Sequence, residues 1–297
     1  MLIDYFPFFN ERELLELRIR LLEPHVDHFV ICEADRTFSG IAKPLIVPNL
    51  IQELGLPRDR ITVVQLQVPA DLDLPLEEHD ITSQYPEDRA DLVSIKAYAR
   101  DRAQRNGLLR VLDQFDPDTW VLMSDADEII NPDHLGWAMH TARNNPDQII
   151  KLPLINLYGR ADLRPYFRDG QPFIWRTAMS LCQARIIAQT TPHRIRCEHA
   201  VPAACVKPTL NGDIFDEFGW HFSWMGGADR VAIKSRSYAH ASNQGHQQHA
   251  RRGFRFEEGR PLAWDENSVL KRFPLDQLPS KIFELPHVRD FLLPVSN

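Results

Sequence analysis

Short apolar runs and amphipathic stretches follow one another along the first half of the chain. Apolar runs predict buried strands at Leu2–Phe6, Phe29–Cys32, Ile61–Leu66 and Trp120–Ser124. Apolar residues at helical spacing predict helices at Glu11–Leu22, Asp91–Gly107 and Pro132–Asn144. Before the first helix, Asn10 and Glu13 have the spacing of a capping box. Strands that alternate with helices favour an α/β fold with a mainly parallel sheet and flanking helices.

The pattern changes near residue 150. Strands are predicted at Ile149–Leu157, Phe173–Cys182 and Ala184–Ile187, and a short helix at Ala228–Ser237. The acidic segment 72–91 is expected to be a long surface loop or lid. Because no flexible glycine- and serine-rich stretch marks the change, we expect one domain over residues 1–297. Its expected parts are two halves, 1–150 and 151–245, and a tail, 246–297, that packs on them.

Composition places the chain among ordinary soluble proteins. Of its 297 residues, 43% are hydrophobic and 25% are charged. The net charge of −7 argues against a nucleic-acid-binding surface. The four cysteines are scattered, so reduced thiols are expected, with a Cys197–Cys205 bridge left open. No apolar stretch reaches bilayer length and no secretory signal opens the chain, so we expect a cytosolic protein.

An acidic motif directly follows the fourth predicted strand. Asp125 and Asp127 are two residues apart, so both carboxylates face one side if the strand geometry continues. Ligands of open α/β sheets bind at this carboxyl edge of the strands. Paired carboxylates repel each other unless a cation neutralises them, and oxygen ligands suit a hard divalent ion that also binds a diphosphate. A solvated acidic turn is the alternative; an EF-hand loop is a poor fit, because Ile130 stands where that loop needs glycine.

Three separated segments together resemble one known family. The first extends from Asp4–Glu11 through Glu33–Gly40, the second is Ser124–Ile129, and the third is Gly219–Trp224. In combination they resemble glycosyltransferase family 17. The resemblance implies a GT-A-type, Rossmann-like fold, an inverting N-acetylglucosaminyltransferase-like mechanism and a nucleotide-sugar donor, UDP-GlcNAc. It also implies a glycan or glycolipid acceptor, and a lipid-linked acceptor would bring the enzyme to the membrane periphery.

The metal site has three expected ligands. Asp125 and Asp127 would hold Mn²⁺ or Mg²⁺ against the donor diphosphate. The family resemblance adds His221 as the third ligand, since imidazole suits Mn²⁺. His240 is the competing candidate for that position. Without the resemblance, a histidine among aromatic residues is more often a hydrogen-bonded core residue.

The donor site is expected on the residues that flank the metal motif. Glu33, Arg36 and Thr37 follow the second predicted strand, at the expected nucleoside edge, and a plain polar turn is the alternative. Arg100 and Asp101 lie on the helix before the metal strand, which in GT-A enzymes borders the nucleotide. Their alternative is a surface ion pair of little energetic value. Asp125 would contact the donor through the metal.

Inverting transfer also needs a general base that deprotonates the acceptor hydroxyl. The sequence offers Asp229, after the Gly-Gly pair of the aromatic cluster, and Glu217, just before that cluster. Asp229 is preferred. Two other functions use the same motif: a haloacid-dehalogenase-like phosphatase with Asp125 as nucleophile, and a non-catalytic nucleotide-sugar-binding module.

Overall fold

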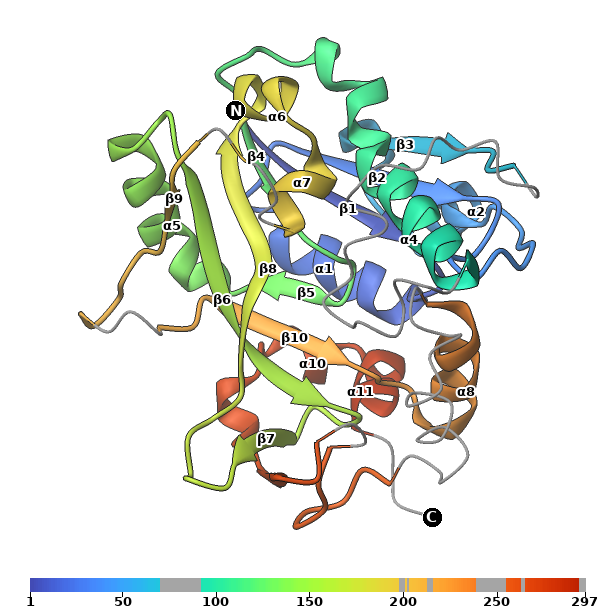
Figure 1. Ribbon diagram of the computed structural model, residues 1–297, viewed down its shortest axis with the longest axis vertical. Helices are drawn as coiled ribbons and strands as arrows, with labels where there is room; N and C mark the ends of the chain where they lie inside the picture. The colour runs from blue at the N-terminus through green and yellow to red at the C-terminus, as the bar shows by residue number, and fades with distance from the viewer. Residues whose placement is uncertain are drawn as a thin grey trace.

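The computed structural model of the chain is shown in Figure 1. It describes residues 1–69, 92–197, 201, 203–212, 216–238, 255–262 and 265–293. The expected lid at 72–91 and the candidate ligand His240 lie outside the described residues. Among the described helices, none has both the length and the apolar character needed to cross a bilayer.

One twisted sheet organises the molecule, in the strand order β3-β2-β1-β4-β8-β6-β10-β5, with β9 beside β6. Its first four strands are parallel. They are β1 (Leu2–Phe8), β2 (His28–Ala34), β3 (Ile61–Leu66) and β4 (Trp120–Met123). Their connections carry α1 (Arg12–Leu22), α2 (Val47–Glu53), η1 (Arg58–Arg60), α4 (Leu92–Arg105), η3 (Asn106–Arg110) and η4 (Leu112–Gln114). This half therefore has the alternation that the sequence predicts.

The second half adds strands of both directions. β8 (Ile174–Gln183) is antiparallel to β4 and to β6 (Ile149–Tyr158), and β10 (Gly219–Ser223) is parallel to β6. The short β5 (Glu128–Ile130) pairs antiparallel with β10, so that His221 stands opposite Glu128. The motif after β4 is thereby joined to the far end of the sheet.

The remaining elements surround this sheet. On or beside it lie α5 (Pro132–Asn144), α6 (Ala184–Gln189), α7 (Pro192–Cys197), β9 (Cys205–Val206) and α8 (Gly227–Ser237). The lower part of Figure 1 holds β7 (Leu163–Phe167), which pairs antiparallel with β11 (Ser268–Arg272) in a second, two-stranded sheet. The last elements of the chain are η5 (Leu275–Gln277), α10 (Lys281–Glu284) and α11 (Pro286–Leu292). The expected α/β class, with a mainly parallel sheet and flanking helices, is confirmed.

Two local predictions are wrong. Residues 184–187 begin helix α6 instead of a strand, because β8 ends at Gln183 and Ile187 reaches the core from the helix. The capping box at Asn10 does not form: α1 begins at Arg12, and the Glu11 side chain accepts the backbone N–H groups of Phe9 and Asn10 instead. The Glu11 carboxylate therefore binds the segment before the helix, and no side chain caps the N–H groups of the first turn of α1.

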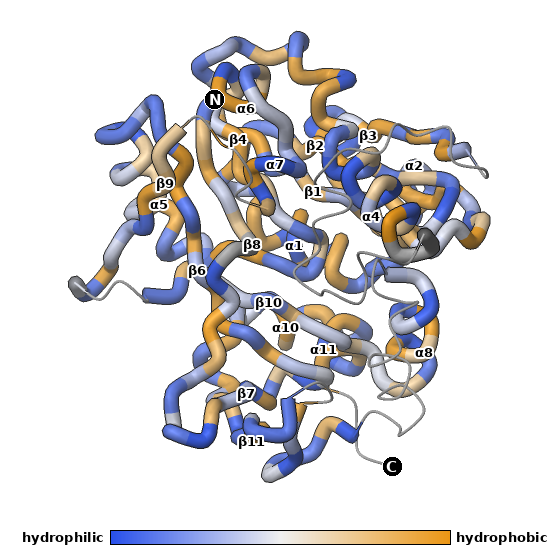
Figure 2. Tube along the Cα trace, viewed as in Figure 1, coloured by the Kyte–Doolittle hydropathy of each residue, from blue (hydrophilic) through white to orange (hydrophobic). Residues whose placement is uncertain are grey.

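Apolar residues of the central strands form the core on both faces of the sheet, and in Figure 2 the apolar colour gathers around β1, β2 and β4. A further cluster joins the two ends of the chain. There Leu14 and Leu17 of α1 pack with Ile282, Val288 and Leu292 of the C-terminal helices. The carboxyl end of β4 is followed directly by the polar residues Ser124 and Asp125.

Candidate active site

The acidic motif forms a tight turn between β4 and β5, and a buried arginine holds its backbone. Arg18 of α1 donates to the carbonyl oxygens of Asp125, at 2.7 Å, and Glu128, at 2.8 Å. It also donates to Ser124 Oγ at 2.8 Å and forms a fully buried ion pair with Asp4. A charge-assisted network of this kind fixes the turn and thus the directions of its carboxylates.

Asp125 lies between two guanidinium groups from different elements. Arg105, at the end of α4, bonds both of its carboxylate oxygens, and Arg196 of α7 donates to Oδ2 at 3.0 Å. Burial raises the pKa of Asp125, but the positive charges of Arg105 and Arg196 outweigh burial and lower that pKa to about 2. Asp101 in turn accepts from Arg105 Nε at 3.0 Å. Asp125 is therefore ionised and already neutralised by protein cations.

Glu128 is fully buried and receives four hydrogen bonds. Oε1 accepts from Trp175 Nε1 at 2.7 Å and from Arg196 at 2.7 Å. Oε2 accepts from Arg196 at 2.9 Å and from the backbone N–H of Asp125 at 2.9 Å. Because a carboxylate offers about four acceptor positions, these bonds use its full capacity. Glu128 thus ties β5, β8 and α7 together.

Asp127 has a different environment from its two neighbours. Its Oδ2 accepts from Lys234 Nζ of α8 at 2.7 Å, and His221 Nε2 lies 3.7 Å from the same oxygen. Burial raises the pKa of Asp127, whereas Lys234 and His221 lower it, and the net shift is downward. The His221 ring stacks on Trp175 with centroids 4.6 Å apart. Its Nδ1 is buried and has no hydrogen-bond partner among the described residues.

Ligand atoms of Asp127, Glu128 and His221 lie within 4.8 Å of one another, so this cluster can hold a metal ion. Glu128 has no acceptor capacity left, which makes Asp127 and His221 the residues that fit a cation best. Two protein ligands are enough for Mg²⁺ or Mn²⁺ when phosphate oxygens and water supply the others. The structure brings two of the three expected ligands together, while the third, Asp125, faces arginines.

The residues expected at the nucleoside edge form an ordered loop after β2. Glu33 is buried and accepts from the backbone N–H groups of Ile46 and Val47 at the start of α2. Arg36 donates to the Gly40 carbonyl at 3.2 Å, and Thr37 Oγ1 accepts from the Ile41 N–H at 3.0 Å. These contacts shape the loop, and donor binding by the three residues stays a prediction.

Arg100 of α4 lies against this loop and donates to the Phe38 carbonyl at 3.1 Å. A Cβ built on Gly40 would lie 3.0 Å from its guanidinium group. Its buried Nε has no partner among the described residues. Burial and the nearby charge of Arg36 both lower the pKa of Arg100. Two guanidinium groups side by side make the loop a region of positive potential.

Neither candidate base belongs to the metal cluster found among the described residues. Asp229 is exposed in the first turn of α8. It is about 200° around the helix from the buried Val231, so it faces solvent. Glu217 forms an ion pair with Arg164 and lines a separate groove of 610 Å³ together with Trp220. The structure does not bring either carboxylate to Asp127, and both assignments stay predictions.

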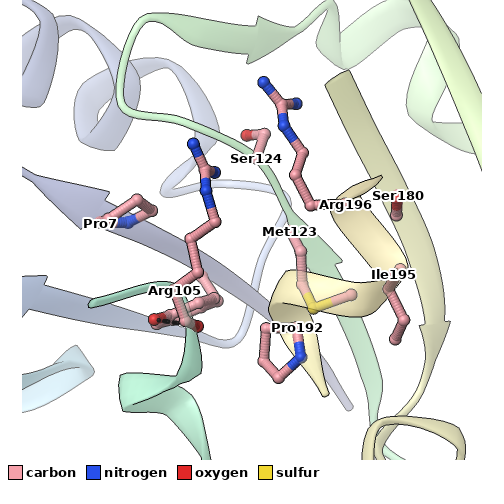
Figure 3. Close-up of a pocket in the computed structure, with 9 residues that line it drawn as sticks. Pro7, Arg105, Met123, Ser124, Ser180, Pro192, Ile195 and Arg196 are labelled. Carbon is pink, nitrogen blue, oxygen red and sulfur yellow. Dashed lines mark hydrogen bonds between the residues drawn. The ribbon is translucent and has the colours of Figure 1, made fainter. Parts of the chain in front are cut away.

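Figure 3 shows Arg105 and Arg196 extending from two elements toward the turn that carries Ser124. The cavity below them is 20 Å³ in volume, which is room for about one water molecule. A sugar nucleotide therefore cannot bind in this cavity.

A family model described as Glycosyltransferase family 17 matches residues 1–158, more than half of the 297 residues. The chain belongs to glycosyltransferase family 17. The protein is therefore a glycosyltransferase. The matched segment contains β1 to β5 and the acidic motif, and its sheet is the Rossmann-like sheet expected of the GT-A class.

No curated protein matches this family 17 chain. The solved structures to which it is similar include the following three. A 4-diphosphocytidyl-2C-methyl-D-erythritol synthase is 13% identical, covers 73% of this chain and 91% of its own, and has a TM-score of 0.40. S. aureus TarS 1-349 is 10% identical, the match covers 82% of this chain and 72% of the TarS chain, and the TM-score is 0.42. The Francisella tularensis 2-C-methyl-D-erythritol 4-phosphate cytidylyltransferase is 10% identical, the match covers 70% of this chain and 90% of the cytidylyltransferase chain, and the TM-score is 0.36.

Sequence reasoning missed the basic side chains of this family 17 site. The sequence gives one weak indication of the role of Arg105, because Arg105 stands four residues after Asp101 on a helix and the two side chains can form an ion pair. Arg196 and Lys234 had none, because they meet their carboxylates across 71 and 107 residues. Only the folded chain shows that the acidic motif is matched by cations from α4, α7 and α8.

Proposed function

We propose that the protein transfers N-acetylglucosamine from UDP-GlcNAc to a hydroxyl of a glycan or glycolipid acceptor, with inversion and with Mn²⁺ or Mg²⁺ as cofactor. One observation carries the proposal. Asp127 and His221 converge in the turn after β4, Lys234 of α8 pairs with Asp127, and Arg105 of α4 and Arg196 of α7 pair with Asp125 of the same turn. A diphosphate with a bound cation matches this mixture of charges.

Each side chain then has a defined task. Asp127 and His221 would hold the cation, which when bound neutralises the charge of the departing nucleoside diphosphate. Arg105 and Arg196 would keep the turn rigid through their ion pairs with Asp125, Asp101 and Glu128. Asp101 positions Arg105 through its 3.0 Å hydrogen bond.

The nucleoside end of the donor is assigned to the loop after β2. Glu33 fixes that loop to α2, and Thr37 and Arg36 fix its shape. Arg100 supports the assignment most directly, since its buried Nε has no partner among the described residues. A polar group of the donor would supply one.

The general base is assigned to Asp229, with Glu217 as the alternative. The base takes the acceptor hydroxyl proton while the oxygen attacks the anomeric carbon, and the diphosphate leaves with the bonding electron pair. Asp229 is exposed, so an acceptor could reach it. Glu217 already pairs with Arg164, and because of burial its pKa is raised despite that partner.

The phosphatase alternative is not favoured. Its nucleophile must present a free carboxylate oxygen, whereas both oxygens of Asp125 accept hydrogen bonds from Arg105 and Arg196. The donor assay described next distinguishes an enzyme from a non-catalytic nucleotide-sugar-binding module.

The test is a donor assay with and without Mn²⁺. The purified chain is mixed with UDP-GlcNAc and a pool of glycan acceptors, and UDP release and labelled product are measured. We expect Mn²⁺-dependent release that Asp127→Asn lowers by at least about 10²-fold. Donor binding without any turnover would identify a binding module, and no response to any nucleotide sugar would contradict the proposal. A cytosolic location and the lipid-linked acceptor stay predictions.

A further inference from the structure

The turn between β10 and α8 has an unusual backbone. Trp224, Gly226 and Gly227 all have positive φ angles, of 60°, 90° and 75°. A bulky residue such as tryptophan rarely adopts this conformation, so its presence indicates strain that the surrounding packing must offset. The turn connects β10 to α8. His221 of β10 and Lys234 of α8 reach the same carboxylate, that of Asp127.

Lys234 neutralises Asp127 in this arrangement. Its Nζ lies 2.7 Å from Asp127 Oδ2, and its side chain is 30% exposed while that of Asp127 is 8% exposed. Burial lowers the pKa of Lys234, but the charges of Asp127 and Glu11 outweigh it and raise that pKa. The Nζ also lies 5.8 Å from the centre of the Trp224 ring. The lysine thus occupies Oδ2, the Asp127 oxygen that faces His221 and that a cation held by both residues would use.

We propose that Lys234 is a built-in counter-ion of the metal site, which a divalent cation displaces from Asp127 and which then pairs with the donor diphosphate. The proposal rests on the proposed metal-dependent function. Asp127 cannot bind Lys234 and a divalent ion through one oxygen without strong repulsion between the two cations. A lysine has a flexible stem, so its ammonium group can move to a phosphate without any change in α8.

His221 and Asp127 face each other without a hydrogen bond between their side chains. Their closest atoms are 3.7 Å apart, which is too long for a hydrogen bond. The imidazole is held instead by its stacking on Trp175. A ligand position of this kind is preformed and needs only the removal of Lys234 to accept a cation.

The first test measures Mn²⁺ affinity by calorimetry without nucleotide. We expect Lys234→Met to bind Mn²⁺ about two- to fivefold more tightly than the original chain, the size expected for loss of a partly exposed ion pair. Lys271→Met is the matched control, because Lys271 lies on β11 against Tyr166 and its removal changes the net charge equally. This control should leave the affinity unchanged.

A double-mutant cycle assigns the effect to Asp127. In an Asp127→Asn background, Lys234→Met should no longer change Mn²⁺ binding, because the shared carboxylate is gone. An equal gain in both backgrounds would overturn the proposal, since it would place the effect elsewhere. Unchanged or weaker Mn²⁺ binding by Lys234→Met would also overturn it.

The second test measures UDP affinity at saturating Mn²⁺. Lys234→Met should weaken UDP binding, the opposite sign to its effect on the metal, and equal UDP affinity would refute the transfer of the lysine to the diphosphate. Lys234→Gln and thermal melts of both variants separate these effects from misfolding. If no variant binds Mn²⁺, the displacement proposal fails, while the sugar-transfer assay still decides the proposed function independently.

Discussion

Asp125 and Asp127 belong to one short motif but have different neighbours. Asp125 is bonded by Arg105 and Arg196, whereas the charged partners of Asp127 among the described residues are Lys234 and the more distant His221. The two carboxylates therefore have different tasks in this structure. Asp125 fixes two arginines in place, and Asp127 is the one that can exchange its cation.

We predict that Asp127→Asn removes most of the Mn²⁺ affinity, while Asp125→Asn reduces it less and costs more stability. Loss of Asp125 leaves two partly buried guanidinium groups without their shared acceptor, which we expect to lower the free energy of unfolding by about 2 kcal/mol. Calorimetric Mn²⁺ titration and urea unfolding of both variants measure the two effects. The reverse ranking in the titration would make Asp125 the principal ligand.

The depressed pKa of Asp125 predicts an acid dependence of stability. Its value in the folded chain is about 2, against an ordinary 3.8. Because the folded pKa is lower, the carboxylate contributes stability above the ordinary value and loses it as pH falls toward the folded value. The difference in unfolding free energy between the original chain and Asp125→Asn should therefore be constant near neutral pH and shrink below about pH 4. A difference independent of pH would show that the ion pairs contribute little.

At the scale of single elements, the β10–α8 turn decides where Lys234 lies. Gly226 and Gly227 both have positive φ, but their surroundings differ. A Cβ on Gly226 would lie 2.2 Å from Phe291 of α11, whereas a Cβ on Gly227 would meet nothing within 4 Å. Gly226 is needed because of its positive φ and because a side chain would collide with Phe291, whereas Gly227 is needed because of its positive φ alone.

We predict that Gly226→Ala destabilises the protein more than Gly227→Ala. The second substitution should cost about 1–2 kcal/mol, the price of a left-handed conformation. The first should cost more, because the methyl group also collides with Phe291. Urea unfolding measures both, and Mn²⁺ affinity reports whether α8 has moved. Equal losses would mean that α11 shifts easily and that the contact has no structural weight.

The elements themselves were largely predictable from the sequence. Apolar runs and helical spacing gave the strands β1 to β4 and the helices α1, α4 and α5, because these patterns are local. Residues 184–187 were misassigned, because a short apolar run does not distinguish a strand from a buried helical turn. The pairing of three-residue β5 with β10 was not predictable, since its partner lies about ninety residues away in the chain.

At the scale of the whole molecule, the C-terminal helices pack on the first helix of the chain. Val288 and Leu292 of α11 share a cluster with Leu14 and Leu17 of α1. His287 also contacts Glu16 at 2.6 Å. The segment that follows the family 17 match thus completes the core of the N-terminal half.

We predict that Val288→Ala lowers the stability of the whole chain by about 1–3 kcal/mol and keeps its unfolding a single transition. Far-UV circular dichroism and tryptophan fluorescence should shift together in urea, because α11 and the sheet share one core. Leu275→Ala, at an exposed position nearby, is the control and should change little. Two separated transitions would mean that residues 1–150 fold independently of the tail.

The sequence alone determined the α/β class, the place of the acidic motif at the end of a strand, and the family. These follow from hydrophobic periodicity and from short motifs, which act over a few neighbouring residues. Tertiary structure alone decided which cation meets which carboxylate: Arg105 and Arg196 for Asp125, and Lys234 for Asp127. Ion pairs across 71 and 107 residues depend on how the sheet brings distant helices to one edge, and no local pattern encodes that arrangement.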